Sequence, residues 1–243
     1  METLIFNLSG QGAAYTKPHI NSVNLTYQHI HKPALLGMLG AILGMKGHLE
    51  KEKDEKFPEF YEKLKGLKVA ILPKSNYFPI NTYQVTEGSC LINKVGGKAA
   101  SCVNKEQMLE YPNWTILIQR GEVNEDIFEE LKEKVKRGFG VFFPYLGKSQ
   151  FAATIDEVKV LDLKRVKDNR GKILGLIKDR DVEVLEDFSL EDDFYFIDNY
   201  YPVAYRSYAN YYKEDKFLLT NKFLSWSDGT SIYNYEGENI YFF

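Results

Sequence analysis

Three glycines and two cations lie between residues 137 and 153. Arg137 and Gly138 begin this segment, Gly140 follows after one phenylalanine, and Gly147 precedes Lys148 further on. Glycine has no Cβ, so its backbone can approach a bulky group closely. Successive amides in a turn form a concave anion site, to which a lysine adds a point charge. The residues alone leave two interpretations open: a phosphate-binding turn, or a structural corner that binds nothing.

The triplet Gly147-Lys148-Ser149 invites comparison with the phosphate loop of nucleotide-binding proteins. That motif needs a glycine five places before Gly147, where this chain has Phe142. It also needs a helix that starts at the lysine, whereas residues 150–155 are typical of a strand. The pattern therefore excludes a nucleoside triphosphatase of this class.

A second candidate surface follows a strand predicted at residues 4–8. Residues 9–18 are mostly small, and among them Tyr15 and Lys17 offer a stacking face and a charge. Further along, His29 and His31 alternate, so in an extended segment they share one face. Two histidines without a third ligand do not define a metal site, and we interpret them as polar surface histidines.

Composition places the chain among globular proteins, with 243 residues, 44% hydrophobic residues and a net charge of −3. Any nucleic-acid site must therefore be a local patch. Eight basic and three acidic residues fall within 159–180, and eight acidic residues and no basic ones within 181–198. The basic segment could face a polyanion that the acidic one would repel; alternatively, the two are solvated faces that compensate each other.

Two features of the sequence predict a cytoplasmic protein. Cys90 and Cys102 are too far apart for a CxxC motif and have no companion pair, so we expect free thiols in a reducing compartment. The first residues lack the basic start of a signal peptide. The most apolar predicted helix has about 14 residues, short of the roughly 20 that span a bilayer, so we expect no membrane segment.

These candidate residues must be positioned by an alternating set of elements. Pro33 suits the first turn of a helix over residues 33–46, and Gly47 suits its end. Gly37, Gly40 and Gly44 would form a smooth face that presses against a sheet. Asn124 is a candidate cap for an amphipathic helix over 124–137. A further short helix is predicted at 58–65, and strands at 67–72, from about 83, and at 114–119.

Between these elements, residues 88–112 form a predicted insertion, a hairpin that carries Lys94, Lys98 and Lys105. The order of strands and helices up to residue 155 is the ferredoxin-like arrangement, which RNA-recognition modules share. Short predicted strands follow at 158–163, 173–177, 182–185 and 194–197. The fold class is therefore α+β, with a ferredoxin-like (RRM-like) domain at 1–155 and a smaller β-rich domain at 156–243.

Two motifs carry a resemblance to a known family. The first runs from Leu8-Ser9-Gly10 through Tyr15 and Lys17-Pro18, and is followed by the glycine-containing run at 33–44. The second is the stretch at 140–151, GVFFPYLGKSQF. In their order and spacing, over about the first two-thirds of the chain, these motifs resemble the CRISPR-associated RAMP superfamily. The likeness is to the family-five subunit of type I Cascade complexes, and within it to the type I-B branch.

The resemblance implies a non-catalytic RNA-binding subunit that needs no cofactor or metal. Such proteins hold the 5′ handle of the CRISPR RNA, contact the backbone-forming family-seven subunit and the large family-eight subunit, and meet target DNA only through the complex. Their thumb hairpin corresponds to the predicted insertion. The RNA-binding residues expected on this basis are Tyr15, Lys17, Lys94, Lys98, Lys105, Arg137, Gly138, Gly140, Tyr145, Gly147 and Lys148.

Two other functions stay open at this point. In type I-C systems the family-five protein cuts precursor RNA without a metal, by acid–base chemistry on a 2′-hydroxyl. Tyr27, His29, His31 and Lys32 carry suitable groups, but they do not match that branch's catalytic set, so we place cleavage below scaffolding. A nucleic-acid-free assembly protein would fit the modest charge but leaves the basic insertion unexplained.

Overall fold

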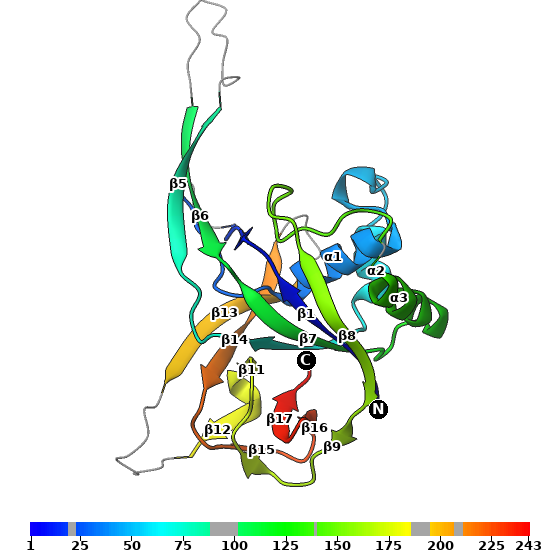
Figure 1. The fold of residues 1–243 in the computed structure, drawn as a ribbon, viewed down its shortest axis with the longest axis vertical. Helices are drawn as coiled ribbons and strands as arrows, with labels where there is room; N and C mark the ends of the chain where they lie inside the picture. Colours follow the sequence, from blue (N-terminus) through cyan, green and yellow to red (C-terminus); the bar gives the residue numbers. More distant parts are fainter. Residues whose placement is uncertain (19–22, 88–101, 139, 186–194, 207–210) are drawn as a thin grey trace, which may run out of the picture.

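A four-stranded antiparallel sheet lies at the centre of the molecule in the computed structural model (Figure 1). The structure describes residues 1–18, 23–87, 102–138, 140–185, 195–206 and 211–243. The central sheet has the order β4-β7-β1-β8. Its strands are β1 (Glu2–Ser9), β4 (Lys68–Pro73), β7 (Asn113–Gln119) and β8 (Thr154–Asp162).

Both faces of this sheet are covered along β1, β4 and β7, which explains why these three strands are largely apolar, whereas β8 is mostly exposed. Side chains alternate between faces along a strand. In β1, Leu4, Phe6 and Leu8 join the main core with the helices, whereas Ile5 points to the opposite face. There it packs in a smaller core with Ile240 and residues of β4 and β7. The sheet is thus the middle layer between the helices and part of the C-terminal strands.

The helix predicted at 124–137 is confirmed as α3 (Glu125–Arg137). The Asn124 side chain accepts hydrogen bonds from the amides of Asp126 (2.8 Å) and Ile127 (3.4 Å). Gly138 ends the helix in a left-handed conformation, with φ of 69°. The short helix predicted at 58–65 is α2 (Glu59–Leu64). None of the helices in the described ranges is long and apolar enough to cross a membrane.

The helix predicted at 33–46 is shorter than expected. It is α1 (Lys32–Leu43), and it ends at Gly44, not at Gly47. Gly44 adopts φ of 80°, and its amide donates to the carbonyls of Gly40 and Ala41. The left-handed conformation of Gly44 ends the helix, three residues before the predicted stop at Gly47. A one-turn 3₁₀ helix, η1 (His48–Glu50), follows.

The prediction that the glycine face of α1 presses against a sheet is wrong. It packs against α2 instead, where a Cβ added at Gly40 would lie 2.4 Å from the Cβ of Phe60. A Cβ added at Gly44 would lie 2.8 Å from a methyl group of Val141. A helix face made of glycines permits close approach to any neighbour, so the glycine spacing predicts close packing but not which element packs there.

Two long strands, β5 (Ile80–Glu87) and β6 (Cys102–Glu110), run together away from the body (Figure 1). They pair antiparallel along their length, from Ile80↔Leu109 to Glu87↔Cys102. At its base β6 also pairs with β2 (Gly12–Ala13) and β3 (Val23–Asn24). Of the insertion predicted at 88–112, residues 88–101 lie outside the described residues, and with them Lys94 and Lys98.

Short strands form three small sheets in the C-terminal part of the chain. One has the order β11-β14-β13, a second β10-β15-β12, and a third β17-β16-β9. Their bounds are β9 (Lys164–Arg165), β10 (Arg170–Gly171), β11 (Ile177–Lys178), β12 (Val182–Val184), β13 (Phe196–Tyr205), β14 (Tyr212–Thr220), β15 (Leu224–Trp226), β16 (Ile232–Tyr235) and β17 (Glu238–Tyr241), with a 3₁₀ helix η2 (Asp179–Asp181). The strand predicted at 173–177 is wrong except for Ile177.

The predicted division after residue 155 falls inside β8, and packing crosses it. Tyr201 of β13, together with Phe217 and Leu219 of β14, belongs to the same core as Leu35 of α1. The two parts therefore share a core, and the proposed division into two domains stays a prediction.

Candidate nucleic-acid interface

The glycine-rich segment crosses the C-terminal end of α1. The amides of Val141 and Phe142 donate to the carbonyls of Ile42 (2.9 Å) and Ala41 (3.2 Å). Carbonyls in the last turn of a helix lack the usual helical partners, so the segment supplies a donor to Ile42 and a second donor to Ala41, which also accepts from Gly44. A Cβ added at Gly140 would lie 3.1 Å from the Cα of Ile42. Gly140 is therefore needed for close approach to the helix, and it does not adopt a positive φ.

The second half of the segment is a closed turn that packs on residues 10–15. The amides of Leu146 and Phe151 donate to the carbonyls of Phe151 (2.8 Å) and Lys148 (2.9 Å), and the amide of Ala14 donates to Leu146 (3.1 Å). Gly147 has φ of 84°, and a Cβ there would lie 1.9 Å from the carbonyl oxygen of Ala14. The strand predicted from residue 150 begins only at Thr154, because residues 150–153 belong to this turn.

The two sequence motifs are thus packed against each other. A Cβ added at Gly10 would lie 2.6 Å from Leu146, which is fully buried, and one at Gly12 would lie 2.8 Å from the ring of Phe151. Several amides of the segment already donate to protein carbonyls, so those amides are not free to bind a phosphate.

A groove of about 790 Å³ lies between α1, the glycine-rich segment and the β13–β14 pair. Four of the predicted binding residues line it: Tyr15, Tyr145, Gly147 and Lys148. Small residues of α1 contribute Ala34, Gly37 and Ala41, and aromatic groups are contributed by Phe142, His48, Tyr205 and Tyr212. A surface with a smooth helix face and several rings suits flat, unstacked bases, which single-stranded RNA presents.

The aromatic residues of the groove differ in exposure. Tyr145 is 47% exposed, which leaves its ring open to a stacking partner. Tyr15 is only 3% exposed, and its ring packs against His31 (5.8 Å) and Trp114 (6.3 Å between centroids). Burial raises the pKa of Tyr15. Tyr145 is therefore the better placed of the two predicted aromatic residues for stacking.

Lys148 is held by a carboxylate on the hairpin. Its ammonium pairs with Glu106 of β6. The Lys148 side chain is 26% exposed and that of Glu106 is 11% exposed. The hydrogen bond from Lys148 is the largest cause that lowers the pKa of Glu106, with further bonds from Tyr83 and Asn24 acting in the same direction. Lys148 is thus both anchored and reachable from the groove.

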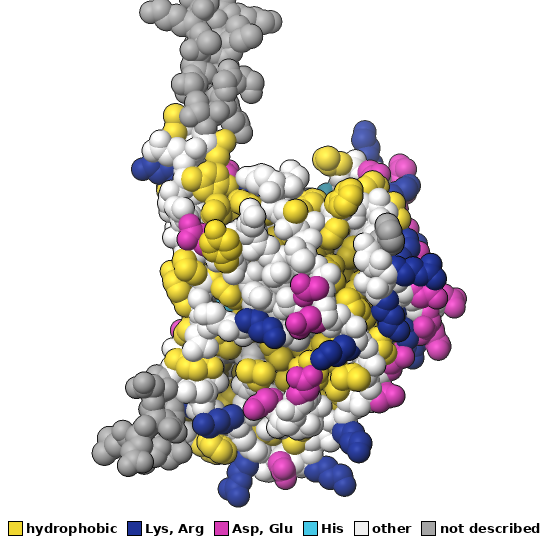
Figure 2. Space-filling view, viewed as in Figure 1, with side chains coloured by type: hydrophobic (Ala, Val, Ile, Leu, Met, Phe, Trp, Pro, Cys, Tyr) yellow, Lys and Arg dark blue, Asp and Glu magenta, His cyan; other side chains and the backbone are white. Residues whose placement is uncertain are grey.

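The other predicted cations within the described ranges, Lys17, Lys105 and Arg137, do not line the groove. Lys17 is half-buried, with its ammonium 5.3 Å from the centroid of the Tyr27 ring. Lys105 is exposed on β6. Arg137 and Gly138 lie at the C-terminal end of α3, where Arg137 pairs with Glu133 at 3.6 Å. On the face shown in Figure 2, basic and acidic side chains are interspersed along the edge where α3 lies.

The prediction that His29 and His31 are surface residues is wrong, since they are 1% and 4% exposed. His31 Nδ1 accepts a hydrogen bond from the amide of Ala34 (3.3 Å) and caps α1. His29 Nδ1 accepts one from the indole N–H of Trp114 (3.3 Å). Burial lowers the pKa of each histidine to about 3, so both are neutral at pH 7. These contacts give both histidines a structural role.

The remaining groups of the cleavage alternative are also buried or paired. Tyr27 donates its hydroxyl hydrogen to the carboxylate of Glu214, and burial followed by this contact raises its pKa. Burial, followed by the charges of Lys178 and Lys68, lowers the pKa of Lys32 to about 8. Among the described residues, no three histidine, cysteine, aspartate or glutamate side chains are grouped so that they could hold a metal ion.

Side chains of the basic stretch and of the acidic stretch each form ion pairs with residues of β14. Lys178 and Arg180 pair with Asp215 at 3.1 and 3.2 Å, and Asp198 pairs with Lys216 at 2.9 Å. Residues 186–194 of the acidic stretch lie outside the described residues.

Sequence reasoning missed several residues of this region. Glu106 lies in the stretch that drew attention for its lysines, and its pairing with Lys148 joins positions 42 residues apart. Tyr205 and Tyr212 belong to a tyrosine-rich run at 200–212, but nothing in the run indicates that it meets α1. The abundance of tyrosine in this run was the only sequence signal for these residues, and it did not indicate which tyrosines line the groove.

Comparison with known families decides the classification. The model of the family described as CRISPR-associated protein (Cas_Cas5) matches residues 3–222. The chain belongs to this family. The family resemblance inferred from the two motifs is therefore confirmed. A search of curated protein sequences gives no match.

Two solved structures show the same fold. One is titled "CRISPR RNA-guided surveillance complex", with a TM-score of 0.53, 14% identity and coverage of 90% of both chains. The other, a crystal structure of a CRISPR protein from Archaeoglobus fulgidus, has a TM-score of 0.54 and 13% identity over 99% of this chain and 98% of that one. At such low identity the likeness concerns the fold, which is α+β as predicted.

Proposed function

We propose that this protein is a non-catalytic RNA-binding subunit of a type I CRISPR surveillance complex (Cascade) in the cytoplasm. In this role it holds the 5′ handle of the CRISPR RNA and takes part in antiviral defence. One observation carries the proposal: the two motifs that mark the family pack against each other and form one groove with α1. Membership of the family and the fold of a surveillance-complex chain support it.

The arrangement of elements supports an RNA-binding fold. The central sheet has α1 between β1 and β4, and α3 between β7 and β8. That order corresponds to the ferredoxin-like arrangement found in RNA-recognition modules. The β5–β6 hairpin is the candidate thumb that pushes against the guide. Lys105, and in the segment outside the described residues Lys94 and Lys98, would contact phosphates along it.

Stacking and a few cations account for binding by a protein of net charge −3. Bases splayed from a hooked strand stack on Tyr145 and on the neighbouring rings of the groove. Lys148 binds a phosphate at the groove, and Lys17 and Arg137 supply charge elsewhere on the path. The glycines act indirectly: Gly140 and Gly147 let the turn pack on α1 and on Ala14, and this packing places Tyr145 and Lys148 at the groove.

The partners follow from this role. The protein would contact the family-seven backbone subunit and the large family-eight subunit, and target DNA only through the assembled complex. It uses no cofactor and no metal in this function.

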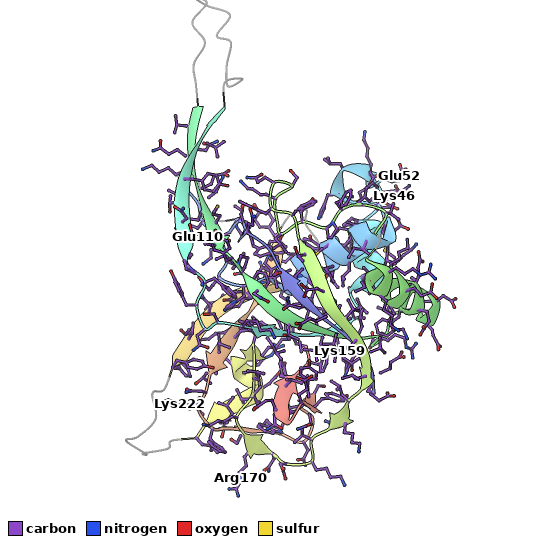
Figure 3. The ribbon with its side chains drawn as sticks, viewed as in Figure 1. Lys46, Glu52, Glu110, Lys159, Arg170 and Lys222 are labelled. Carbon is purple, nitrogen blue, oxygen red and sulfur yellow. The ribbon has the colours of Figure 1, made fainter. Side chains whose placement is uncertain are left out.

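The test is the affinity of the purified full chain for single-stranded repeat RNA over a salt series. Tyr145→Ala should weaken binding by about 1–3 kcal/mol, the value of one base–aromatic stack. Lys148→Ala should weaken binding of all sequences alike and lower the salt slope by about 0.7, the single-strand value for one phosphate. Lys159→Ala is the control, because Lys159 lies on β8 and pairs with Glu236 at 3.4 Å (Figure 3). Unchanged affinity and slope in the folded groove variants would contradict the proposal.

The alternative of a precursor-cleaving endoribonuclease is tested separately. Repeat RNA incubated with the protein should remain intact, with or without divalent metal. Specific cutting that is lost in a folded His31→Ala variant would replace the scaffold role with an enzymatic one.

A further inference from the structure

One carboxylate on the hairpin joins three separate segments of the chain. Glu106 lies on β6 and is 8% exposed. It accepts hydrogen bonds from Asn24 of β3 at 3.0 Å and from Tyr83 of β5 at 2.9 Å, and it pairs with Lys148 of the glycine-rich turn. A buried carboxylate with three donors is fully satisfied. The proposed function accounts for Lys148 but gives Glu106 no role.

The contact with Glu106 limits what Lys148 can do. Its withdrawal from Glu106 would leave a buried negative charge without a counter-ion, which is strongly destabilising. An ammonium has three hydrogens, however, and Lys148 also lines the groove. Lys148 can therefore meet a phosphate only from the position in which Glu106 holds it.

The same contact connects the hairpin to the groove. In the described ranges, two polar side-chain contacts link turn and hairpin: Lys148 pairs with Glu106, and Gln150 donates to Tyr83 at 3.5 Å. The two contacts lie side by side, because Tyr83 of β5 and Glu106 of β6 are directly opposite each other in the hairpin. A shift of the hairpin base would therefore move the lysine that faces the groove.

We propose that Glu106 is a positioning residue for RNA binding: it docks the base of the β5–β6 hairpin on the glycine-rich turn and orients Lys148 toward the groove. This inference rests on the proposed function. The position of the hairpin and phosphate binding at Lys148 are then coupled. A phosphate bound at Lys148 stabilises the docked hairpin, and a docked hairpin favours phosphate binding.

The sign of one substitution separates this role from simple electrostatics. Glu106→Gln removes a negative charge beside a phosphate site, so Coulomb attraction alone predicts tighter RNA binding. If Glu106 positions Lys148, the variant binds RNA more weakly, with a fold-loss similar to that of Lys148→Ala. The double variant should then lose no more than either single variant, because both changes break one unit. Tighter binding by Glu106→Gln, or additive losses, would overturn the inference.

Glu110→Gln is the matched control. Glu110 lies on the same strand, at its body end (Figure 3), and accepts a hydrogen bond from Asn81 at 2.9 Å. Its neutralisation changes net charge by the same amount without touching Lys148. It should leave RNA affinity within about twofold of the unmodified protein, since surface changes of this kind are usually small.

A second readout needs no RNA. Amide hydrogen exchange reports local opening, and in Glu106→Gln it should be faster in both 140–153 and the hairpin base, with α3 unchanged. Tyr83→Phe keeps the charge and should accelerate the same segments more weakly, which covers the case in which Glu106→Gln does not fold. If the unmodified protein binds no RNA, the proposed function fails while faster exchange still supports the docking role. Unchanged exchange in both variants would overturn that role whatever the RNA result.

Discussion

Gly147→Ala tests whether the turn is held in place as the geometry requires. A Cβ at this position would lie 1.9 Å from the carbonyl oxygen of Ala14, whereas real Cβ atoms essentially never come within 3.0 Å of such an atom. The φ of 84° adds a left-handed penalty of roughly 1–2 kcal/mol. The added Cβ would also push the turn away from Ala14. By analogy with overpacked cores, this separation lowers the free energy of unfolding by about a further 1–3 kcal/mol. The expected loss of unfolding free energy is therefore about 2–5 kcal/mol.

Gly138→Ala provides the control within the same chain. Gly138 has φ of 69°, but a Cβ there would meet nothing within 4 Å. It should lose only the conformational part, roughly 1–2 kcal/mol. Urea unfolding of the three proteins under one set of conditions measures both losses. Equal losses, or a larger loss for Gly138→Ala, would refute the packing of the turn on Ala14.

Two further predictions concern stability. The unfolded chain takes up protons at His29 and His31 below pH 6.5, whereas burial lowers their folded pKa to about 3, so stability must fall as pH decreases. The expected loss between pH 7 and pH 5 is about 2 kcal/mol for each histidine, and urea midpoints that stay constant over this range would contradict their burial. Gly40→Ala should destabilise α1 because its Cβ would lie 2.4 Å from Phe60, whereas at Gly37 the nearest ring atom is 3.7 Å away. Gly37→Ala should be neutral or stabilising by up to about 1 kcal/mol, and the reverse order of unfolding temperatures would show that α1 and α2 pack differently.

The sequence predicted those elements whose signals are local. Asn124 as a cap and the apolar face of α3 depend on neighbours within two turns, and both are confirmed. Strands β1, β4 and β7 of the central sheet were predicted because both of their faces are buried, which makes continuous apolar runs, whereas the exposed β8 has no such run. The short C-terminal strands have two to four residues in most cases, too few for a periodic pattern to define them.

What the sequence could not predict depends on distant contacts. The burial of His29 follows from its packing against Trp114, which is 85 residues away. The pairing of Glu106 with Lys148 spans two segments that no local pattern connects. Four of the predicted binding residues do converge on one groove, because the two sequence motifs to which they belong pack against each other. Arg137 was predicted to bind RNA because it begins the glycine-rich segment, but in the structure it lies outside the groove.

The most direct test of the RNA-binding role is photo-crosslinking in the assembled complex. The protein would be purified with its partner subunits and a CRISPR RNA carrying 4-thiouridine in the 5′ handle, and crosslinked peptides would be identified by mass spectrometry. We predict RNA with one defined 5′ end and crosslinks at Phe142, Tyr145, Tyr205 and Tyr212, with none in the acidic stretch at 181–198. RNA of random 5′ ends, or crosslinks confined to α3 and the acidic stretch, would contradict the proposal that this groove holds the handle.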